Sequence, residues 1–337
     1  MKTKMITCLA LAALLPAIAG ADGYYAMTFP GWGVYENDGT WGSTAQLTAA
    51  TATSLATGDV DGDGANDLVA AFVGGGVWAY TASGWGSISV ANANNGVAVG
   101  DRNGDGVDEI IMSIGGGGVW SYDSVAGTTT QVSGSDALSM VTGDLNGNGS
   151  DEIVMNFASG VWVDNGATSW SLGGTAQHLT IGDIDGDGDD DAVMGYAGGV
   201  WATEGTSGAT AYMIHNAGVG LDLMASDLDG NGTDEIVMAL GGGQGIWAND
   251  GTLGGNTLVH GLDGEQLASG DTDGDGIDEL LVSFGAGIGM YKIDGGVASA
   301  LDASPSNVIA VVAIPEPATL GLFSLLGGGM LWMRKRF

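Results

Sequence analysis

The sequence predicts an all-β protein: a seven-bladed β-propeller with four-stranded blades. Three observations support this fold class. An acidic motif recurs about every 42 residues, and strand-like apolar segments lie between the motifs. A second motif, a Gly-apolar-aromatic triplet, occurs seven times. No helical periodicity interrupts the repeats.

The recurring motif is GDxDGDGxDE, and it occurs six times with small variations. Its first aspartates are Asp59, Asp101, Asp144, Asp183, Asp227 and Asp271, at separations of 42, 43, 39, 44 and 44 residues. This period is typical of a four-stranded propeller blade.

The second repeat shows the strands of one unit. Residues 97–99 lead into the motif, residues 109–114 leave it, and residues 119–122 and 128–132 follow after Gly-rich turns. Short apolar segments bounded by Gly and Asn are typical of β-strands. The unit therefore predicts four strands.

The second landmark is a Gly-apolar-aromatic triplet, which occurs once more often than the motif. Its aromatic residues are Tyr35, Trp78, Trp120, Trp162, Trp201, Trp247 and Tyr291. We expect them in the blade core, with stacking on sugar rings as the alternative. The tryptophans outside this register are better candidates for sugar contact: Trp32, Trp41, Trp85 and Trp170. Four methionines share one repeat position and are expected between blades: Met112, Met155, Met194 and Met238.

The two ends of the repeat region predict how the ring closes. Residues 24–29 match the strand that leaves a motif, and residues 307–314 match the strand that enters one. We therefore expect the last blade to be shared, with one strand from the C-terminal end and three from the N-terminal end. Such a blade removes exposed sheet edges.

Each motif has the ligand spacing of a calcium loop. In the first one, Asp59, Asp61 and Asp63 occupy positions 1, 3 and 5, Ala65 offers its backbone carbonyl at position 7, and Asp67 closes the shell at position 9. Calcium takes six to eight oxygen ligands. The other five predicted ligand sets are Asp101, Asn103, Asp105, Val107 and Glu109; Asp144, Asn146, Asn148, Ser150 and Glu152; Asp183, Asp185, Asp187, Asp189 and Asp191; Asp227, Asp229, Asn231, Thr233 and Glu235; and Asp271, Asp273, Asp275, Ile277 and Glu279.

An EF-hand, a zinc or magnesium site and a salt-adapted surface all fit the acidic loops less well. An EF-hand needs a Glu at position 12, where this chain has apolar residues such as Ala70 and Met112. Zinc prefers His or Cys, and magnesium prefers a tighter octahedron. A salt-adapted surface would spread its acids, whereas 26 of the 39 acids in residues 22–314 lie in the six nine-residue loops. The sequence predicts up to six Ca²⁺ ions.

The charge balance excludes some partners. Residues 22–314 contain two basic residues, Arg102 and Lys292, against 39 acidic ones, a formal charge of −37. Such a surface repels nucleic acid and anionic lipid. The one cysteine, Cys8, lies in the predicted leader, so we expect no disulfide in the exported chain.

The two ends of the chain are predicted to be sorting segments. Residues 1–21 have the basic start, apolar stretch and small-residue cleavage site of a signal peptide, cut after Ala19 or Ala21. In residues 315–337, a Pro-Glu-Pro triplet precedes an apolar transmembrane segment and a basic end. The alternative for this tail is a permanent anchor.

The tail closely resembles a PEP-CTERM sorting signal in the order and position of its parts. That resemblance implies a Gram-negative bacterium, an exosortase-type enzyme as partner, a transient inner-membrane anchor, and association with exopolysaccharide or biofilm. Residues 24–314 resemble FG-GAP/VCBS-type propeller repeats, through the motif quoted above. This resemblance implies a seven-bladed propeller with calcium loops on one face, within a domain spanning residues 22–314.

These observations favour an exported, calcium-binding scaffold or adhesin at the cell surface or in the extracellular matrix, whose partner is exopolysaccharide or a surface protein. A lectin that binds carbohydrate in inter-blade clefts is the alternative. A propeller enzyme, such as a polysaccharide lyase, is disfavoured because His178, His215 and His260 lie in no motif with a nucleophile or metal partner. We therefore expect no enzymatic activity.

Overall fold

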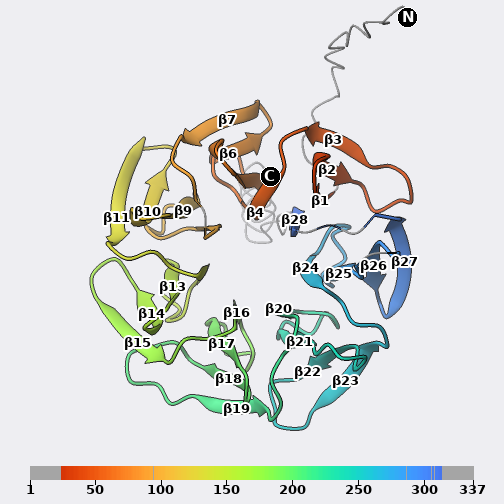
Figure 1. Ribbon diagram of the computed structural model, residues 1–337. Coiled ribbons are helices and arrows are strands. Elements are labelled where there is room, and N and C mark those ends of the chain that lie inside the picture. Colours follow the sequence, from red (N-terminus) through yellow and green to blue (C-terminus); the bar gives the residue numbers. More distant parts are fainter. Residues whose placement is uncertain (1–23, 94, 286, 305, 307, 313–337) are drawn as a thin grey trace, which may run out of the picture.

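Seven four-stranded antiparallel sheets form a ring in the computed structural model (Figure 1). The structure describes residues 24–312, apart from residues 94, 286, 305 and 307. Within these residues every regular element is a strand. The predicted seven-bladed propeller is confirmed.

Six blades are built from consecutive strands, running from the innermost strand outward. Blade 1 comprises β4 (Ala52–Gly58), β5 (Asp67–Phe72), β6 (Gly76–Thr81) and β7 (Gly84–Ser89). Blade 2 comprises β8 (Val97–Gly100), β9 (Glu109–Ile114), β10 (Gly118–Asp123) and β11 (Thr128–Ser133). Blade 3 comprises β12 (Ser139–Gly143), β13 (Glu152–Phe157), β14 (Gly160–Asp164) and β15 (Ser169–Gly173).

The next three blades repeat this order. Blade 4 comprises β16 (His178–Gly182), β17 (Asp191–Tyr196), β18 (Gly199–Thr203) and β19 (Tyr212–His215). Blade 5 comprises β20 (Asp222–Ser226), β21 (Glu235–Ala239), β22 (Ile246–Asn249) and β23 (Asn256–His260). Blade 6 comprises β24 (Gln266–Gly270), β25 (Glu279–Ser283), β26 (Met290–Asp294) and β27 (Val297–Asp302).

Blade 7 closes the ring with strands from both ends of the repeat region. Its innermost strand is β28 (Val308–Val312), followed by β1 (Tyr24–Phe29), β2 (Gly33–Asn37) and β3 (Ala45–Thr48). β28 pairs antiparallel with β1, and Tyr24 lies opposite Val312. β28 also contacts β24 and β4, the inner strands of the neighbouring blades. The predicted shared blade is confirmed.

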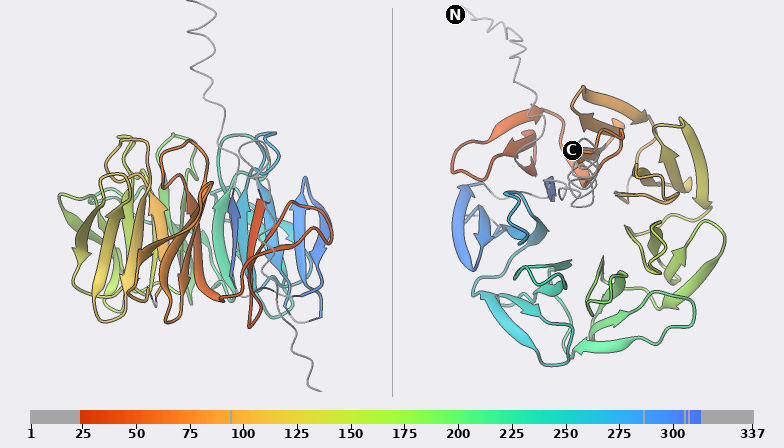
Figure 2. Two further views of the ribbon diagram at one scale, coloured as in Figure 1. Left: turned by 90° about the horizontal axis from the view of Figure 1, so that it is seen from above. Right: turned by 180° about the vertical axis from the view of Figure 1, so that it is seen from behind.

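Seen from the side, the blades stand next to one another and form a thick disc (Figure 2). The predicted signal peptide and C-terminal tail lie outside the described residues. No helix within the described ranges has the length and apolarity needed to cross a membrane.

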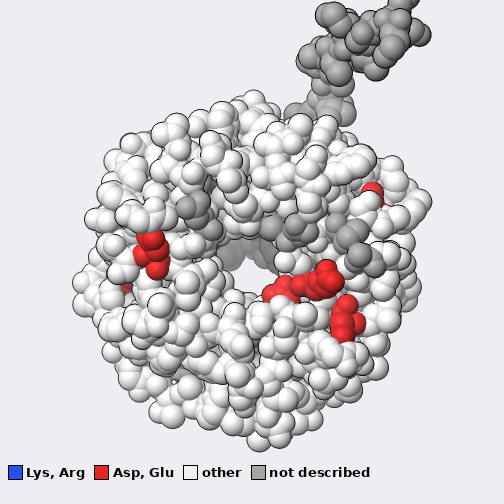
Figure 3. Space-filling view, viewed as in Figure 1, with Lys and Arg blue, Asp and Glu red and all other residues white. Residues whose placement is uncertain are grey.

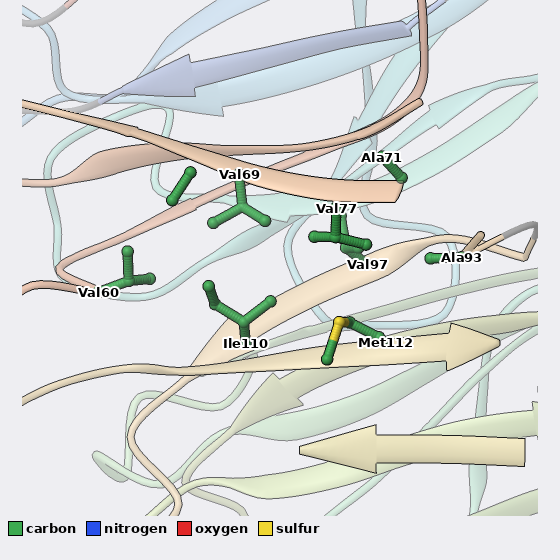
Figure 4. Packing of buried hydrophobic residues seen from close by; sticks show 9 residues of the cluster. Val60, Val69, Ala71, Val77, Ala93, Val97, Ile110 and Met112 are labelled. Atoms are coloured by element: carbon green, nitrogen blue, oxygen red, sulfur yellow. The ribbon is translucent and has the colours of Figure 1, made fainter. Parts of the chain in front are cut away.

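The hydrophobic core lies between adjacent blades. Figure 4 shows one such cluster, in which Val69 of β5 faces Ile110 and Met112 of β9. Val60, at position 2 of the first acidic loop, joins this cluster and is 2% exposed. The four methionines at the shared repeat position are all buried, which confirms that prediction.

The repeated aromatic residues are less buried than we expected. They lie on the third strand of each blade and pack at the edge of the core, and none of them is fully buried. Trp162 is 37% exposed. The Nε1 groups of Trp78 and Trp120 donate to carbonyls in the preceding turns of their own blades, at 2.7 and 2.8 Å. The prediction of a buried plug is therefore only partly right, because the indole N–H must reach a turn carbonyl.

Candidate metal centres

All six acidic loops join the innermost strand of a blade to its second strand. We number them by blade: loop 1 (59–67), loop 2 (101–109), loop 3 (144–152), loop 4 (183–191), loop 5 (227–235) and loop 6 (271–279). Because the connection is equivalent in every blade, the loops share one side of the disc, here called the loop face. Figure 3 shows the other face, on which the described residues present few acidic side chains and no visible Lys or Arg.

Each loop curls around the carboxylate at position 1. In loop 1, Asp59 accepts hydrogen bonds from the N–H groups of Gly62 (2.7 Å), Asp63 (3.1 Å) and Gly64 (2.8 Å). Gly62 and Gly64 have φ values of 79° and 86°, which L-residues with a side chain rarely adopt. Loop 2 repeats the curl around Asp101 at 2.8, 3.2 and 2.8 Å. The motif glycines therefore make the tight loop possible.

The acid at position 9 is the first residue of the second strand, and its carboxylate lies at the base of the loop. Asp67, Glu109, Glu152, Asp191 and Glu279 are at most 5% exposed, and Glu235 is half-buried. This acid accepts the N–H of the residue at position 2, as in the 2.8 Å bond from Arg102 to Glu109. A carboxylate is thus held at the base of each loop. In loops 2 and 3 its second oxygen accepts the amide of the asparagine at position 3.

Four loops bring three predicted ligands together within 4.8 Å. These groups are Asp59, Asp61 and Asp67 in loop 1; Asp183, Asp185 and Asp187 in loop 4; Asp227, Asp229 and Glu235 in loop 5; and Asp271, Asp273 and Glu279 in loop 6. Three carboxylates at this separation repel one another unless a cation lies between them. The clustering agrees with the predicted metal sites.

Loops 2 and 3 are built differently because position 3 is an asparagine. The Asn103 amide donates to Glu109 at 2.6 Å, and the Asn146 amide donates to Glu152 in the same way. In these two loops an amide–carboxylate hydrogen bond takes the place of a carboxylate at position 3. The groups in loops 1 and 6 leave out Asp63 and Asp275 at position 5, and the group in loop 4 leaves out Asp191 at position 9. In every loop the N–H at position 7 donates to the side chain at position 5.

Asp191 supplies the most direct test of whether a cation fits. Its Oδ2 atom is buried in loop 4 and has no hydrogen-bond partner among the described residues. A buried carboxylate oxygen without a partner is costly, and a hard cation would satisfy it. The donors in all six loops are oxygens, which suits Ca²⁺ better than a metal that prefers nitrogen or sulfur.

Burial makes these carboxylates hard to ionise when no cation is bound. Desolvation raises the pKa of Asp67 to about 7, and the nearby Asp61 adds to the effect. Desolvation likewise raises the pKa of Asp191 to about 7, with a further contribution from Asp185. The same cause raises the pKa of the four glutamates at position 9.

These shifts predict the pH dependence of the calcium-free protein. The pKa of Asp is near 3.8 in the unfolded chain and about 7 for these two residues in the folded protein. At pH values between 3.8 and about 7, folding therefore takes up protons. Stability is greatest below the lower value and falls as the pH rises through about 7. Thermal melts of metal-free protein between about pH 5 and pH 8 should show a decreasing melting temperature. A flat or rising profile would contradict the shifts.

The number of carboxylates at positions 1, 3, 5 and 9 differs between loops. Loops 1, 4 and 6 have four, loops 2 and 5 have three, and loop 3 has two. Because calcium affinity depends on ligand charge, we expect loop 3 to be the weakest site. Asn146→Asp should strengthen it by about tenfold in calorimetry, as expected for about 1.4 kcal/mol of added attraction. The matched change Asn216→Asp, at an exposed position between β19 and β20, lies outside every ligand set and should leave the calcium titration unchanged.

The acid at position 8 has a role that the motif alone does not reveal. Its N–H donates to the carbonyl at position 1 of the preceding loop, which links neighbouring blades. Five such bonds measure 2.7–2.9 Å: Asp108 to Asp59, Asp151 to Asp101, Asp190 to Asp144, Asp234 to Asp183, and Asp278 to Asp227. The repeated Asp at position 8 is visible in the motif, but only the structure shows that it reaches the next blade.

The carboxylate at position 8 strengthens this link. Asp234 Oδ2 accepts the N–H of Asp183 at 3.1 Å and lies beneath Gly182, where an added Cβ would approach it to 2.2 Å. Desolvation raises the pKa of Asp234 to about 7. In the fifth link Ser226 replaces the glycine and donates to Asp278 at 3.0 Å. The loops are thus connected in series from blade 1 to blade 6.

Removing one of these carboxylates tests the link. Asp234→Ala should destabilise the protein by about 1–3 kcal/mol and weaken calcium binding in loop 4, because the Asp183 N–H loses its partner. Asp234→Asn keeps an acceptor oxygen and serves as the control. Denaturant melts and calcium titrations of both variants measure the effect. Equal behaviour of the two variants would mean that the acceptor oxygen is unimportant.

The three histidines lie on separate strands: His178 on β16, His215 on β19 and His260 on β23. His178 Nδ1 is 4.0 Å from Asp222 Oδ1, and burial lowers the pKa of this histidine. His260 packs against the ring of Phe284. The structure therefore does not group the histidines with one another.

Comparison with known proteins supports the fold. No protein-family model and no curated protein sequence matches the chain. Among solved structures, an Agrocybe aegerita lectin that recognises non-reducing terminal N-acetylglucosamine has a TM-score of 0.60 at 19% identity, covering 86% of this chain and 91% of the lectin.

Two further structures are similar at lower scores. BBS1N, solved in complex with ARL6DN, has a TM-score of 0.53 at 13% identity and covers 85% of this chain and 87% of its own. A quinonprotein alcohol dehydrogenase-like protein from Bacteroides thetaiotaomicron has a TM-score of 0.52 at 10% identity, over 84% and 74% of the two chains. Identities this low show the fold alone. The chain is a seven-bladed β-propeller with acid-rich loops on one face.

Proposed function

We propose that this chain is an exported calcium-binding propeller of the FG-GAP/VCBS type. The observation that carries the proposal is the recurrence of three carboxylates within 4.8 Å in four equivalent loops. Up to six Ca²⁺ ions, one in each loop, would neutralise this repulsion and hold the inner and second strands of blades 1 to 6 together. The loop-to-loop hydrogen bonds then join the six sites around the ring.

The protein acts, on this proposal, as a non-enzymatic scaffold or adhesin at the cell surface or in the matrix. An exosortase-type enzyme would process the PEP-CTERM-like tail, and exopolysaccharide or a surface protein would be the partner. The pairing of Tyr24 with Val312 places the ends of β1 and β28 side by side at the loop face.

Co-sedimentation with exopolysaccharide isolated from the producing cells tests this role. Calcium-loaded protein should sediment with the polymer, and EGTA should release it. A double variant, Asp61→Ala/Asp185→Ala, removes carboxylates from loops 1 and 4. It should sediment with the polymer less than the parent protein does at the same calcium concentration. Mass spectrometry of the released protein should show the chain starting after residue 19 or 21 and lacking the basic end. Protein that stays in the supernatant with calcium present would refute the matrix role.

A lectin is the second candidate function, favoured by two observations. The structure with the TM-score of 0.60 is a lectin, and clefts open between adjacent blades at the loop face. A lectin would attach the propeller to polysaccharide directly. This candidate shares the calcium sites with the first and differs in the molecule that the protein binds.

A further inference from the structure

One inter-blade cleft has walls of unusual chemistry for so acidic a protein. It lies between blades 3 and 4 beside loop 3, has a volume of about 270 Å³, and is here called the loop 3 cleft. Its polar lining includes Asn146, Asn148, Asn165, Thr168 and Thr206, and Trp170 forms an aromatic wall. The described residues that line it contribute amides, hydroxyls and an indole, with no charged side chain among them.

Trp170 is held rigidly across two blades. It lies on β15 of blade 3, and its Nε1 donates to the carbonyl of Gly205 in blade 4 at 2.8 Å. The repeated tryptophans Trp78, Trp120 and Trp247 instead bond within their own blades. The half-buried indole is therefore fixed before any ligand arrives, which lowers the entropic cost of binding.

The floor of the cleft is equally fixed. Leu145, at position 2 of loop 3, is 1% exposed and packs beneath Gly205, where an added Cβ would come within 2.6 Å of the leucine side chain. Gly205 has a φ of 68°, so this close contact needs glycine. The connection between β18 and β19 is thus pressed against loop 3.

The charges nearest the loop 3 cleft are partly compensated. Asp164, next to Asn165 in the chain, forms a 2.6 Å ion pair with Arg102, and both side chains are at most 14% exposed. Loop 3 has two carboxylates among its side-chain ligand positions, Asp144 and Glu152, which match the charge of one Ca²⁺. Asp189 and Asp190 of loop 4 also lie against loop 3, at Gly147 and at the Asp144 N–H, but neither lines the cleft. The walls that a ligand touches carry no charged side chain.

A second inter-blade cleft makes the contrast clear. It lies between blades 5 and 6, has a volume of about 420 Å³, and its lining includes Asp229, Glu235, Asp250 and Asp278. Four carboxylates there favour a cation over a neutral molecule. The neutral lining therefore distinguishes the loop 3 cleft from a cleft built from the same repeat.

We propose that the loop 3 cleft binds a neutral pyranose unit of a polysaccharide. The apolar face of the sugar stacks on Trp170, and its hydroxyls exchange hydrogen bonds with the amides and hydroxyls of the opposite walls. Asn146 and Asn148 are also calcium-ligand positions, so calcium would order one wall of the cleft. To that extent the sugar site rests on the proposed calcium sites, and it specifies the ligand of the lectin candidate.

Calorimetry with calcium-loaded protein tests the proposal. The probes are N-acetylglucosamine, glucose, galactose and mannose and their short oligomers, with alginate as an acidic polysaccharide. We expect saturable binding of at least one neutral sugar, with quenching of tryptophan fluorescence. Trp170→Ala should weaken it at least about tenfold, as expected for loss of a stacked aromatic contact.

Two further variants keep the result interpretable. Thr206→Trp places a bulky side chain at an exposed position of the cleft and should block the sugar without disturbing the core. Trp41→Ala removes a tryptophan that is 62% exposed and lies outside the cleft, and this variant should bind the sugar like the parent protein.

Absence of binding to every neutral sugar, or binding of alginate alone, would overturn the proposal. Binding unaffected by both cleft variants would also overturn it. A calcium-dependent rise in melting temperature, measured on the same samples, tests the calcium sites separately.

Discussion

Removing calcium with excess EGTA should lower the melting temperature of the propeller by more than about 10 °C. If free calcium is about ten times the dissociation constant, each occupied site contributes about 1.4 kcal/mol. Six sites then contribute about 8 kcal/mol, which is comparable to the whole stability of a typical domain, about 5–15 kcal/mol. The physical cause is the group of carboxylates within 4.8 Å in loops 1, 4, 5 and 6, which repel without a cation.

Three controls separate calcium binding from general screening of charge. EGTA saturated beforehand with calcium should leave the melting curve unchanged. Sodium chloride at about 1 M screens exposed charges but should restore only a small part of the loss, because five of the six acids at position 9 are buried. Magnesium should restore less than calcium, because it demands a tighter octahedron. Identical curves with and without free calcium would show that the loops do not stabilise the fold.

Val311→Asp should produce the second large effect, because Val311 belongs to the strand that closes the ring. The side chain is 5% exposed on β28 and packs in a cluster with Tyr25 of β1 and Leu281 of β25. A carboxylate buried in this apolar cluster is costly, so we expect a loss of about 4 kcal/mol or more in unfolding free energy. Urea denaturation measures the change.

Val297→Asp is the matched control, since it makes the same substitution at a position on β27 that is 69% exposed. It adds the same negative charge to the protein and should change stability by less than about 0.5 kcal/mol. If both variants unfold at the same urea concentration, β28 does not close the ring as described.

The fold could be predicted from the sequence because the pattern of one blade recurs several times along the chain. Residues 109–114, expected to leave the second motif as a strand, coincide with β9. The chain has seven Gly-apolar-aromatic triplets and six acidic motifs, and this difference predicts the shared blade. The pairing of β28 with β1 confirms it. Each repeated position is in effect an independent observation of one structural role.

The ligand geometry could be predicted only in part. Spacing alone indicated that Asp59, Asp61 and Asp67 converge, and they do. The spacing also predicts Asn103 and Asn146 as ligands, and it gives no sign that their amide nitrogens donate to the glutamates at position 9, as they do in the structure. An amide has both donors and acceptors, so its orientation depends on its neighbours in the folded protein.

Contacts between blades could not be predicted from one repeat. The link from Asp108 to Asp59 joins residues of neighbouring units, and nothing within a single motif shows which unit a side chain faces. The repeated tryptophans are expected in the core because they recur in every blade, yet the N–H groups of Trp78, Trp120 and Trp247 reach turn carbonyls at the blade edge. Trp170 was singled out for lying outside the register, but its bond to blade 4 depends on how two blades meet.

The number of calcium ions bound per chain tests most directly whether cations held in repeated carboxylate loops lock the ring. Native mass spectrometry of protein equilibrated with about 1 mM calcium covers the affinity range expected of extracellular calcium modules. We predict that occupancy approaches six ions per chain. As the calcium concentration is lowered, the first ion to be lost should be the one in loop 3, the weakest site. A spectrum dominated by the metal-free chain at this concentration would contradict calcium binding by the loops.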